Sequence, residues 1–333
     1  MDFGIKAAGG RIVFSNDILP DACKTLERYF PGSNVHYGDI ADIHEFPAAD
    51  LVVGGYPCQS FSMAGNRDPK RDARTNLYKQ FLRVVRIVGP KYFVAENVSG
   101  MKQLGSGSFL EEQEKAYKRA GYNVTHQLLN ARDFGVPQSR KRLFIVGVRK
   151  DLQKKFCFPE ATHGKVTKKA PHLKPYSSHG DAIKDLPLWP LGEFYDRPQD
   201  PDEGFSWYFM SRNRKAKWDG PAFTVVANWR HVTLHPASPT MALTWSDLTN
   251  GWKQRWDFTG EHDHLLNGVH RVALEKPRRL SWRECARIQT FPDDFEPVGE
   301  VESKFTQVGN AVPPKLAEVI FRHLFSGDGL VGV

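Results

Sequence analysis

The sequence predicts an α/β fold in which a mostly parallel sheet is covered by helices on both faces. Over residues 1–150, short apolar segments alternate with helix-like segments, as in parallel strands joined by crossover helices. The chain has 333 residues, and at roughly 100–200 residues per domain this length predicts two domains. Aromatic residues make up 12% of the chain, which is enough for a packed core. No apolar stretch approaches the ~18 residues that a membrane-spanning helix needs, so no membrane partner is expected.

The expected elements of the first domain follow one another in the order strand, helix, strand. Strands are expected at Arg11–Ser15, Asn34–Tyr37, Asp50–Gly55, Lys91–Ala95, Val124–Leu129 and Leu143–Val148. Helices are expected at Pro20–Phe30 and Tyr78–Val88, and a third helix is expected to follow Ser108 and to end near Ala120. Pro20 suits the first turn of its helix, and Ser108 with Glu111 predicts a capping box. Ligands of such sheets bind beyond the carboxyl ends of the strands, so residues that follow the strands are candidates for a site.

The pattern changes near residue 159. Residues 159–201 are rich in Pro, His and Lys, and seven of the eight tryptophans lie between Trp189 and Trp256. This predicts a first domain over 1–159 and a smaller, irregular domain over 160–277. Helical character returns at Arg278–Phe295 and Pro314–Phe325, so residues 278–333 are expected to rejoin the first domain.

Charge and cysteine content narrow the class of protein. Lys plus Arg number 46 and Asp plus Glu 38, and the net charge of +8 permits a polyanionic partner. Four cysteines lie far apart without a Cys-x-x-Cys pair, so neither a metal site nor a disulfide framework is expected. This cysteine usage and the lack of a recognisable secretory leader predict a cytoplasmic protein.

Two side chains that follow neighbouring strands could form a catalytic pair. Cys58 follows the strand expected at 50–55, and Glu96 follows the strand expected at 91–95. A catalytic cysteine acts as the thiolate and needs a cationic neighbour or a helix terminus, and a carboxyl group beside it could donate a proton. The alternatives are a buried structural role for Cys58, and a role as a helix cap or surface carboxylate for Glu96.

Further candidates lie at other strand ends. Arg140 and Arg142 alternate in an extended segment, so they are expected to share a face that suits an anionic or carbonyl-rich substrate; a solvated basic edge is the alternative. Asp17 and Asp39 each follow a strand, where a carboxylate can accept ribose hydroxyls or an adenine amine, or can cap a helix. The string Gly309-Asn310 before two prolines predicts a turn.

Taken in order, these strings resemble the DNA (cytosine-5) methyltransferases, especially those of bacterial type II restriction-modification systems. The matching strings are Pro57-Cys58-Gln59, Glu96-Asn97-Val98, Gln138-x-Arg140-x-Arg142, Arg279-Leu280-Ser281-x-Arg283-Glu284 and Gly309-Asn310-x-Val312-Pro313. The resemblance covers nearly the whole chain and implies the Rossmann-like sheet of S-adenosylmethionine-dependent methyltransferases, with residues 160–277 as a target-recognition domain.

The resemblance also implies roles for single residues. Cys58 would add to C6 of a flipped-out cytosine, Glu96 would bind N3, and the loop Ser60–Asn76 would close over the base. Arg140 and Arg142 would hold the base carbonyl and support Glu96 and the backbone. For S-adenosylmethionine, Asp17 would bind the ribose and Asp39 the adenine amine, and the other expected cofactor contacts are Ile40, Pro57, Leu77, Asn310 and Val312.

In the expected target-recognition domain, residues 210–236 are densest in basic and aromatic residues. Candidates for guanine contacts are Arg212, Arg214 and Arg230. Lys215 and Lys217 are expected to contact phosphates. Thr224-Val225 resembles a Thr-apolar pair that lies near the flipped base.

One block of the family is not matched. The family begins with a strand and a Phe-x-Gly-x-Gly loop, whereas Met1–Gly9 resembles the helix after that loop. The strands expected at 11–15 and 50–55 would then flank an empty position in the sheet. Three alternatives follow. The first is an active monomeric methyltransferase of double-stranded DNA, with a separately acting restriction endonuclease as possible partner. The second is an N-terminally truncated relic that only binds DNA, and the third is a transfer-RNA cytosine methyltransferase, against which the long basic, aromatic second domain argues.

Overall fold

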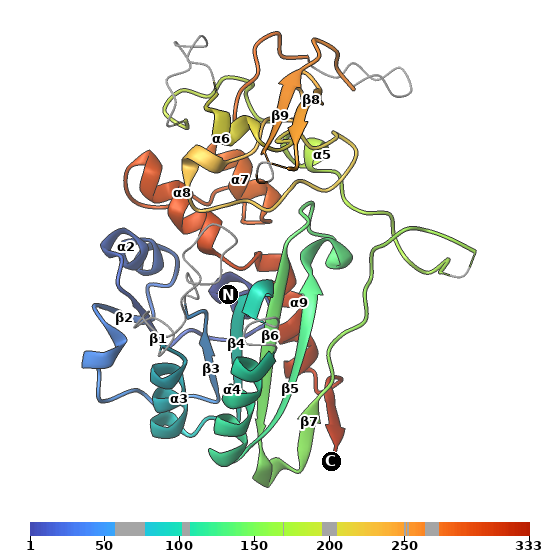
Figure 1. Cartoon of the computed structure of the whole chain (residues 1–333). Coiled ribbons are helices and arrows are strands. Elements are labelled where there is room, and N and C mark those ends of the chain that lie inside the picture. Colours follow the sequence, from blue (N-terminus) through green and yellow to red (C-terminus); the bar gives the residue numbers. More distant parts are fainter. Residues whose placement is uncertain are drawn as a thin grey trace. The chain divides into compact units, whose positions relative to one another are not determined.

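The computed structural model describes residues 1–56, 77–101, 107–168, 170–194, 205–249, 251, 253–263 and 273–333. They form two compact units (Figure 1). The first comprises residues 1–130, 141–160 and 317–333, and the second comprises residues 131–140 and 161–316. The second segment of the first unit ends at residue 160, one residue after the predicted boundary at residue 159. Residues 278–316, which were expected to rejoin the first domain, group with the second unit. The division into a catalytic and a target-recognition domain stays a prediction.

A four-stranded sheet forms the core of the first unit. Its strands, in spatial order, are β3 (Leu51–Gly54), β4 (Tyr92–Val98), β6 (Lys141–Arg149) and β5 (Tyr122–Asn130). β3 pairs parallel with β4, and β6 pairs antiparallel with both of its neighbours, so β6 alone is reversed (Figure 1). The predicted mostly parallel α/β fold is confirmed. The reversal of β6 follows from its short connection to β5, because parallel neighbours need a crossover of about a dozen or more residues.

The sheet is interrupted beside β3. β1 (Phe14–Asp17) pairs parallel with β2 (Asn34–Tyr37) in a separate two-stranded sheet. Within the described ranges, no ladder joins β1 to β3. β1 begins three residues later than expected, because its pairing starts where Phe14 meets Asn34, the first residue of β2. A further antiparallel pair is formed by β7 (Lys154–Phe156) and β10 (Leu330–Gly332).

The helices of this part of the chain are α1 (Asp2–Ala7), α2 (Pro20–Tyr29), α3 (Leu77–Val88), α4 (Ser108–Arg119) and α9 (Pro314–Phe325). α3 and α4 lie against the four-stranded sheet, and α2 lies against β1 and β2. Phe81 of α3 and Tyr117 of α4 pack with Phe93 of β4 in one buried cluster. The predicted capping box of Ser108 is wrong: Gly107, with φ of 95°, precedes the helix, and no side chain caps it. A glycine adopts this left-handed conformation readily, so the helix begins one residue earlier than a Ser108 cap requires.

The second unit has fewer regular elements. Its helices are α5 (His179–Ile183), α6 (Trp207–Met210), α7 (Trp282–Ile288) and α8 (Val301–Asn310), and its strands β8 (Met241–Asp247) and β9 (Lys253–Phe258) form a hairpin. Short 3-10 segments lie at η1 (Ile40–Asp42), η5 (Ala131–Phe134), η6 (Lys150–Leu152) and η7 (Trp229–His231). Helix α8 was not predicted. None of the helices that the structure describes is long and apolar enough to cross a membrane.

Candidate functional site

Glu96 and Arg142 form an ion pair on adjacent strands of the first unit. Glu96 on β4 lies opposite Phe144 of β6, and Arg142 is two residues from Phe144 on the same face. The distance from Arg142 Nε to Glu96 Oε1 is 2.8 Å, and both side chains are about nine-tenths buried, with 14% and 11% exposed. The sheet register therefore fixes the direction in which the carboxylate points.

Burial shapes the electrostatics of this pair. Desolvation lowers the pKa of the Arg142 guanidinium, and the charge and hydrogen bond of Glu96 oppose that shift. Arginine remains a cation at neutral pH in spite of such a shift. Gly55 follows β3, and a Cβ there would lie only 3.2 Å from Glu96 Oε2, so a glycine lets the end of β3 approach the carboxylate.

The chain that leads to Cys58 is held at Tyr56, the last described residue before it. Asn97 Nδ2 donates to the Tyr56 carbonyl at 3.3 Å, and the Tyr56 hydroxyl donates to Gln113 Oε1 at 2.5 Å. Pro57, Cys58 and the expected lid over Ser60–Asn76 lie outside the described residues. Asn97 belongs to one of the matching strings, and its position directly after Glu96 is the one signal for its anchoring role.

Asp17 and Asp39 lie at the carboxyl ends of the parallel strands β1 and β2. Asp17 Oδ1 accepts from Leu19 N at 2.9 Å, and Asp39 Oδ1 accepts from Ala41 N at 2.8 Å, where it caps η1. Burial raises the pKa of the Asp17 carboxyl, although hydrogen bonds from two backbone amides oppose the shift. Both carboxylates thus turn the chain locally and lie at the ligand-binding edge of a parallel pair.

Exposed apolar side chains lie beside these two carboxylates. Ile18 is 63% exposed, Tyr37 is 61% exposed, and Ile40 in η1 is half-buried. Ile18 and Tyr37 were not singled out from the sequence, although each is an apolar or aromatic residue directly at a strand end. Leu77, another expected cofactor contact, is the first residue of α3 and is half-buried.

Arg140 is 1% exposed and donates to backbone carbonyls of the second unit. Its Nη1 lies 2.7 Å from Val225 O, and its Nη2 lies 2.7 Å from Gly309 O and 2.9 Å from Ala311 O. Arg140 and Arg142 thus have different partners: three backbone carbonyls for Arg140, and a carboxylate for Arg142.

Residues 222–225 lie along residues 137–140. Thr224 Oγ1 donates to Ser139 O at 2.8 Å, and Val225 N donates to Gln138 Oε1 at 2.8 Å. Gln138 also donates to Gln289, which in turn donates to the carbonyl of Val308. Gln138 belongs to one of the matching strings but had no role of its own assigned, and Gln289 was not singled out, because a buried glutamine has no distinctive local signal.

The turn predicted at Gly309-Asn310 is wrong. Both residues belong to the last turn of α8. A Cβ on Gly309 would lie 2.3 Å from the backbone at Val226 and Ala227, so glycine is required for close packing and not for an unusual φ. Asn310 is exposed at the end of the helix, and Val312 is buried.

The cationic residues of the second unit differ in exposure. Arg212 and Arg230 are exposed, and Arg230 lies over the Trp229 ring at 5.0 Å. Arg214 is half-buried and donates from Nε to Phe209 O at 3.0 Å. The predicted phosphate contact of Lys215 is wrong, because its side chain is 3% exposed and forms an ion pair with Asp263. The described residues contain no group of three or more His, Cys, Asp or Glu that could hold a metal.

Comparison with known proteins agrees with this geometry. Residues 1–326 match the C-5 cytosine-specific DNA methylase family. The type II methyltransferase M.BspRI of Lysinibacillus sphaericus is 40% identical over 332 residues, which cover 96% of this chain and 71% of the relative. M.BsuRI of Bacillus subtilis is 38% identical over 320 residues, 92% of this chain and 66% of the relative. The structure of the S. pombe Dnmt2 methyltransferase has a TM-score of 0.62 at 19% identity, covers 98% of this chain and 95% of its own, and shares the fold.

Proposed function

Because the chain belongs to the C-5 cytosine-specific DNA methylase family, we propose that it transfers a methyl group from S-adenosylmethionine to C5 of a flipped-out cytosine in a specific duplex DNA sequence. The reaction would proceed through a covalent bond between Cys58 Sγ and C6 of the base. The observation that carries the proposal is the buried pair of Glu96 and Arg142 next to the anchored end of β3.

Each residue of the pair has a step to perform. C5 of cytosine is a poor nucleophile, and addition of the Cys58 thiolate to C6 makes it an enamine carbon. Glu96 would bind N3 and stabilise the negative charge that this addition creates, and Arg142 would hold the Glu96 carboxylate and the base carbonyl. After transfer, loss of the C5 proton and of the Cys58 thiolate would restore the double bond. The base must leave the stack first, which costs a few kcal/mol.

The carboxylates and apolar side chains at the carboxyl ends of β1 and β2 suit the binding of an adenosine. Carboxylates bind ribose hydroxyls and an exocyclic amine, and exposed apolar side chains such as Ile18 and Tyr37 suit the adenine ring. Asp17 would take the ribose and Asp39 the amine, with Ile40 beside the ring. Matches to the family motifs add Pro57, Leu77, Asn310 and Val312. S-adenosylmethionine would supply the electrophilic methyl group when bound.

Recognition of duplex DNA is assigned to exposed cations of the second unit. Arg212 and Arg230 are exposed and can reach base edges, and Arg214 has part of its guanidinium bound to Phe209 O. Thr224, held by Ser139 O, would lie near the flipped base. Arg140 would act as a positioning residue through its bonds to Val225, Gly309 and Ala311.

Transfer of tritiated methyl groups tests this proposal. We expect transfer to duplex DNA that stops on saturation of one sequence, and loss of transfer in Cys58→Ser. The proposal fails if neither duplex DNA nor transfer RNA accepts methyl groups, or if Cys58→Ser is as active as the parent protein. Transfer to transfer RNA alone would establish the alternative substrate. A separately acting restriction endonuclease would cut the same sequence when it is unmethylated.

A DNA-binding protein without transfer activity is the second candidate. Within the described ranges no ladder joins β1 to β3, and this interruption favours the second candidate. The reason is that the proposed cofactor contact Asp17 lies at the end of β1, beside the interruption. Titration calorimetry separates the two candidates: a non-catalytic protein binds duplex DNA with a salt-dependent affinity and releases no heat with S-adenosylmethionine.

A further inference from the structure

One segment of the second unit, which includes the exposed Arg230, is held by hydrogen bonds at both ends. This segment, residues 226–232, is called the strap below. Before it, Val225 N and O bond to Gln138 and Arg140, at 2.8 and 2.7 Å. After it, Thr233 O accepts from Leu280 N at 2.9 Å, and Leu234 forms an antiparallel bridge with Arg279. The ends of the strap are therefore fixed to two different parts of the same unit.

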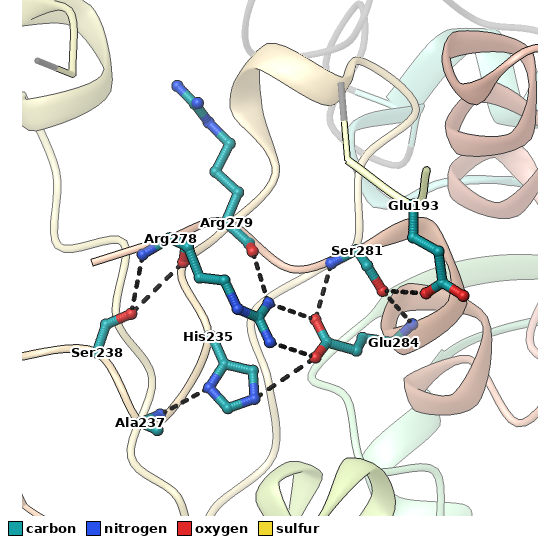
Figure 2. Close-up of polar contacts among 8 residues, drawn as sticks. All are labelled: Glu193, His235, Ala237, Ser238, Arg278, Arg279, Ser281 and Glu284. Carbon is teal, nitrogen blue, oxygen red and sulfur yellow. Dashed lines mark hydrogen bonds and ion pairs between the residues drawn. The ribbon is translucent and has the colours of Figure 1, made fainter. Parts of the chain in front are cut away.

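A buried carboxylate binds residues that flank the second of these attachments (Figure 2). Glu284 on α7 is 1% exposed and binds Arg278 through two hydrogen bonds, of 2.8 Å from Nη1 to Oε2 and 2.7 Å from Nη2 to Oε1. Glu284 Oε2 also accepts from Ser281 N at 2.8 Å, and Ser281 Oγ accepts from Glu284 N, which completes a capping box. Glu284 thus joins the start of α7 to the Arg278 side of the bridge.

His235 connects the same carboxylate to the strap side of the bridge. Its Nδ1 accepts from Ala237 N at 3.1 Å, so Nε2 carries the proton in the neutral ring, and Nε2 lies 3.5 Å from Glu284 Oε1. Burial and the nearby Arg278 charge hold the pKa of His235 well below its ordinary value, which keeps the ring neutral. His235 N also donates to Arg278 O at 2.9 Å. Arg278 and His235 lie on the two strands of the bridge, and Glu284 contacts both.

Between these anchors the strap exposes Asn228 and Arg230, whereas its other side chains are half-buried or buried. Arg230 is exposed and lies over Trp229, and the His231 ring is 5.0 Å from the Tyr208 ring. Asn228 Oδ1 accepts from Arg230 N at 3.0 Å and caps the short turn η7. Because the strap has only seven residues (226–232), we expect a shift of either anchor to move Arg230.

We propose that Glu284, Arg278 and His235 are positioning residues for DNA sequence recognition, which set the strap so that Arg230 reads a base pair next to the methylated cytosine. This inference rests on the proposed methyltransferase function. It assigns a role in sequence discrimination to the buried cluster around Glu284 of α7. A purely structural role of this cluster would not change the discrimination between sequences. None of the three residues is proposed to touch the DNA.

Kinetics on two duplexes test the inference. The methylated sequence is first read from bisulfite sequencing of DNA treated with the parent protein, and each adjacent base pair is then changed in turn. In Glu284→Gln we expect KM for the methylated sequence to rise about tenfold or more, and discrimination against one neighbouring substitution to fall by a similar factor, with kcat within about threefold. An unchanged discrimination ratio, or a fall in kcat alone, overturns the inference.

A double-mutant cycle separates positioning from stability. If Glu284 acts through the strap, Glu284→Gln combined with Arg230→Ala loses no more discrimination than Arg230→Ala alone. Additive losses, or an Arg230→Ala variant with unchanged discrimination, contradict the inference. Arg287→Gln is the matched control, because Arg287 lies on the same helix and binds Asp185 and Asp293 at the surface, so its discrimination should equal that of the parent protein.

Two further arms keep the test decisive. If Glu284→Gln gives little folded protein, His235→Gln makes the same comparison, because it removes one contact to Glu284 and leaves Arg278 paired. Absence of methyl transfer by the parent protein refutes the proposed function. Normal transfer by the parent protein with parental discrimination in Glu284→Gln refutes only the role of the Glu284 cluster.

Discussion

Arg142 Nε lies 2.8 Å from Glu96 Oε1, across two adjacent antiparallel strands of the first unit. The contact is a diagonal one in the sheet register, and both side chains are largely buried. A carboxylate in this position is held in a single direction by its neighbour, and the approach of Gly55 keeps bulky side chains away from its second oxygen. In the proposed reaction this fixed carboxylate meets N3 of the cytosine.

Removing the charge of Glu96 is expected to slow transfer more than it weakens binding. A positioned acid or base contributes about 10²-fold or more, so Glu96→Gln should lower kcat by at least that factor. Arg142→Lys keeps a cation but loses the planar guanidinium, and a loss of about tenfold is expected. Single-turnover methyl transfer measures both effects. Parental rates in Glu96→Gln would remove this residue from the mechanism.

Asp17 should make cofactor binding depend on pH. Burial raises the pKa of its carboxyl, so Asp17 becomes protonated, and loses its capacity to accept two hydrogen bonds, at a higher pH than an ordinary aspartate. Affinity for S-adenosylmethionine should therefore fall as the pH is lowered. In Asp17→Asn, calorimetry should show affinity reduced about tenfold or more and no longer dependent on pH in that range. Equal affinities in the two proteins at neutral pH would exclude the ribose contact.

Gly309→Ala should destabilise the second unit. The added Cβ would meet the Val226–Ala227 backbone at 2.3 Å, and such overpacking costs about 1–3 kcal/mol. Gly220→Ala is the control, since a Cβ there has nothing closer than Lys217 O at 3.9 Å, and its effect should stay within about 0.5 kcal/mol. Urea unfolding followed by tryptophan fluorescence compares the two. Equal stabilities would show that α8 does not pack on these residues in solution.

The buried His179 should make the second unit sensitive to acid. Burial lowers the pKa of His179 to about 4, although its hydrogen bond to Gly220 O opposes the shift. The unfolded chain binds this proton first, so stability is complete above about pH 6.5 and falls as the pH drops toward 4. The expected loss between pH 7 and 5 is about 2 kcal/mol.

The matched variant is His179→Gln, which removes one titrating group. Its stability should fall less steeply with acid, although His235, whose pKa is also lowered, keeps part of the slope. Urea unfolding at both pH values measures this difference. Identical slopes would mean that His179 is protonated or exposed in the folded protein.

The alternation of apolar and helical segments was sufficient to predict the fold class. β2 has the predicted bounds, and β3, α2 and α3 lie within one residue of them, because each is a strongly periodic segment with clear ends. The reversal of β6 could not be read, because pairing direction depends on how the short connection 131–140 folds. Helix α8 was missed because Gly309 suggests a turn unless its packing partner is known.

The site residues could also be predicted only in part from the sequence. Strand ends pointed to Glu96, Asp17 and Asp39, since position along a strand decides which edge a residue reaches. Arg142 was identified by its alternation with Arg140 and by the family resemblance, and the antiparallel pairing of β6 brings it to the end of β4. The burial of Lys215 could not be predicted, because its partner Asp263 is 48 residues away in the sequence. Glu284 belongs to one of the matching strings, but its buried contact with His235 joins residues far apart in the sequence and could not be predicted.

The most direct test of the covalent mechanism uses duplex DNA in which the methylated cytosine is replaced by 5-fluorocytosine. Fluorine at C5 blocks the final loss of the proton, so the bond between Cys58 and C6 cannot be released. With S-adenosylmethionine, we predict a denaturation-resistant complex whose mass equals protein, DNA strand and one methyl group, and no such complex in Cys58→Ser. Methyl transfer to ordinary DNA without any trapped complex, or an equal complex in Cys58→Ser, would contradict the account.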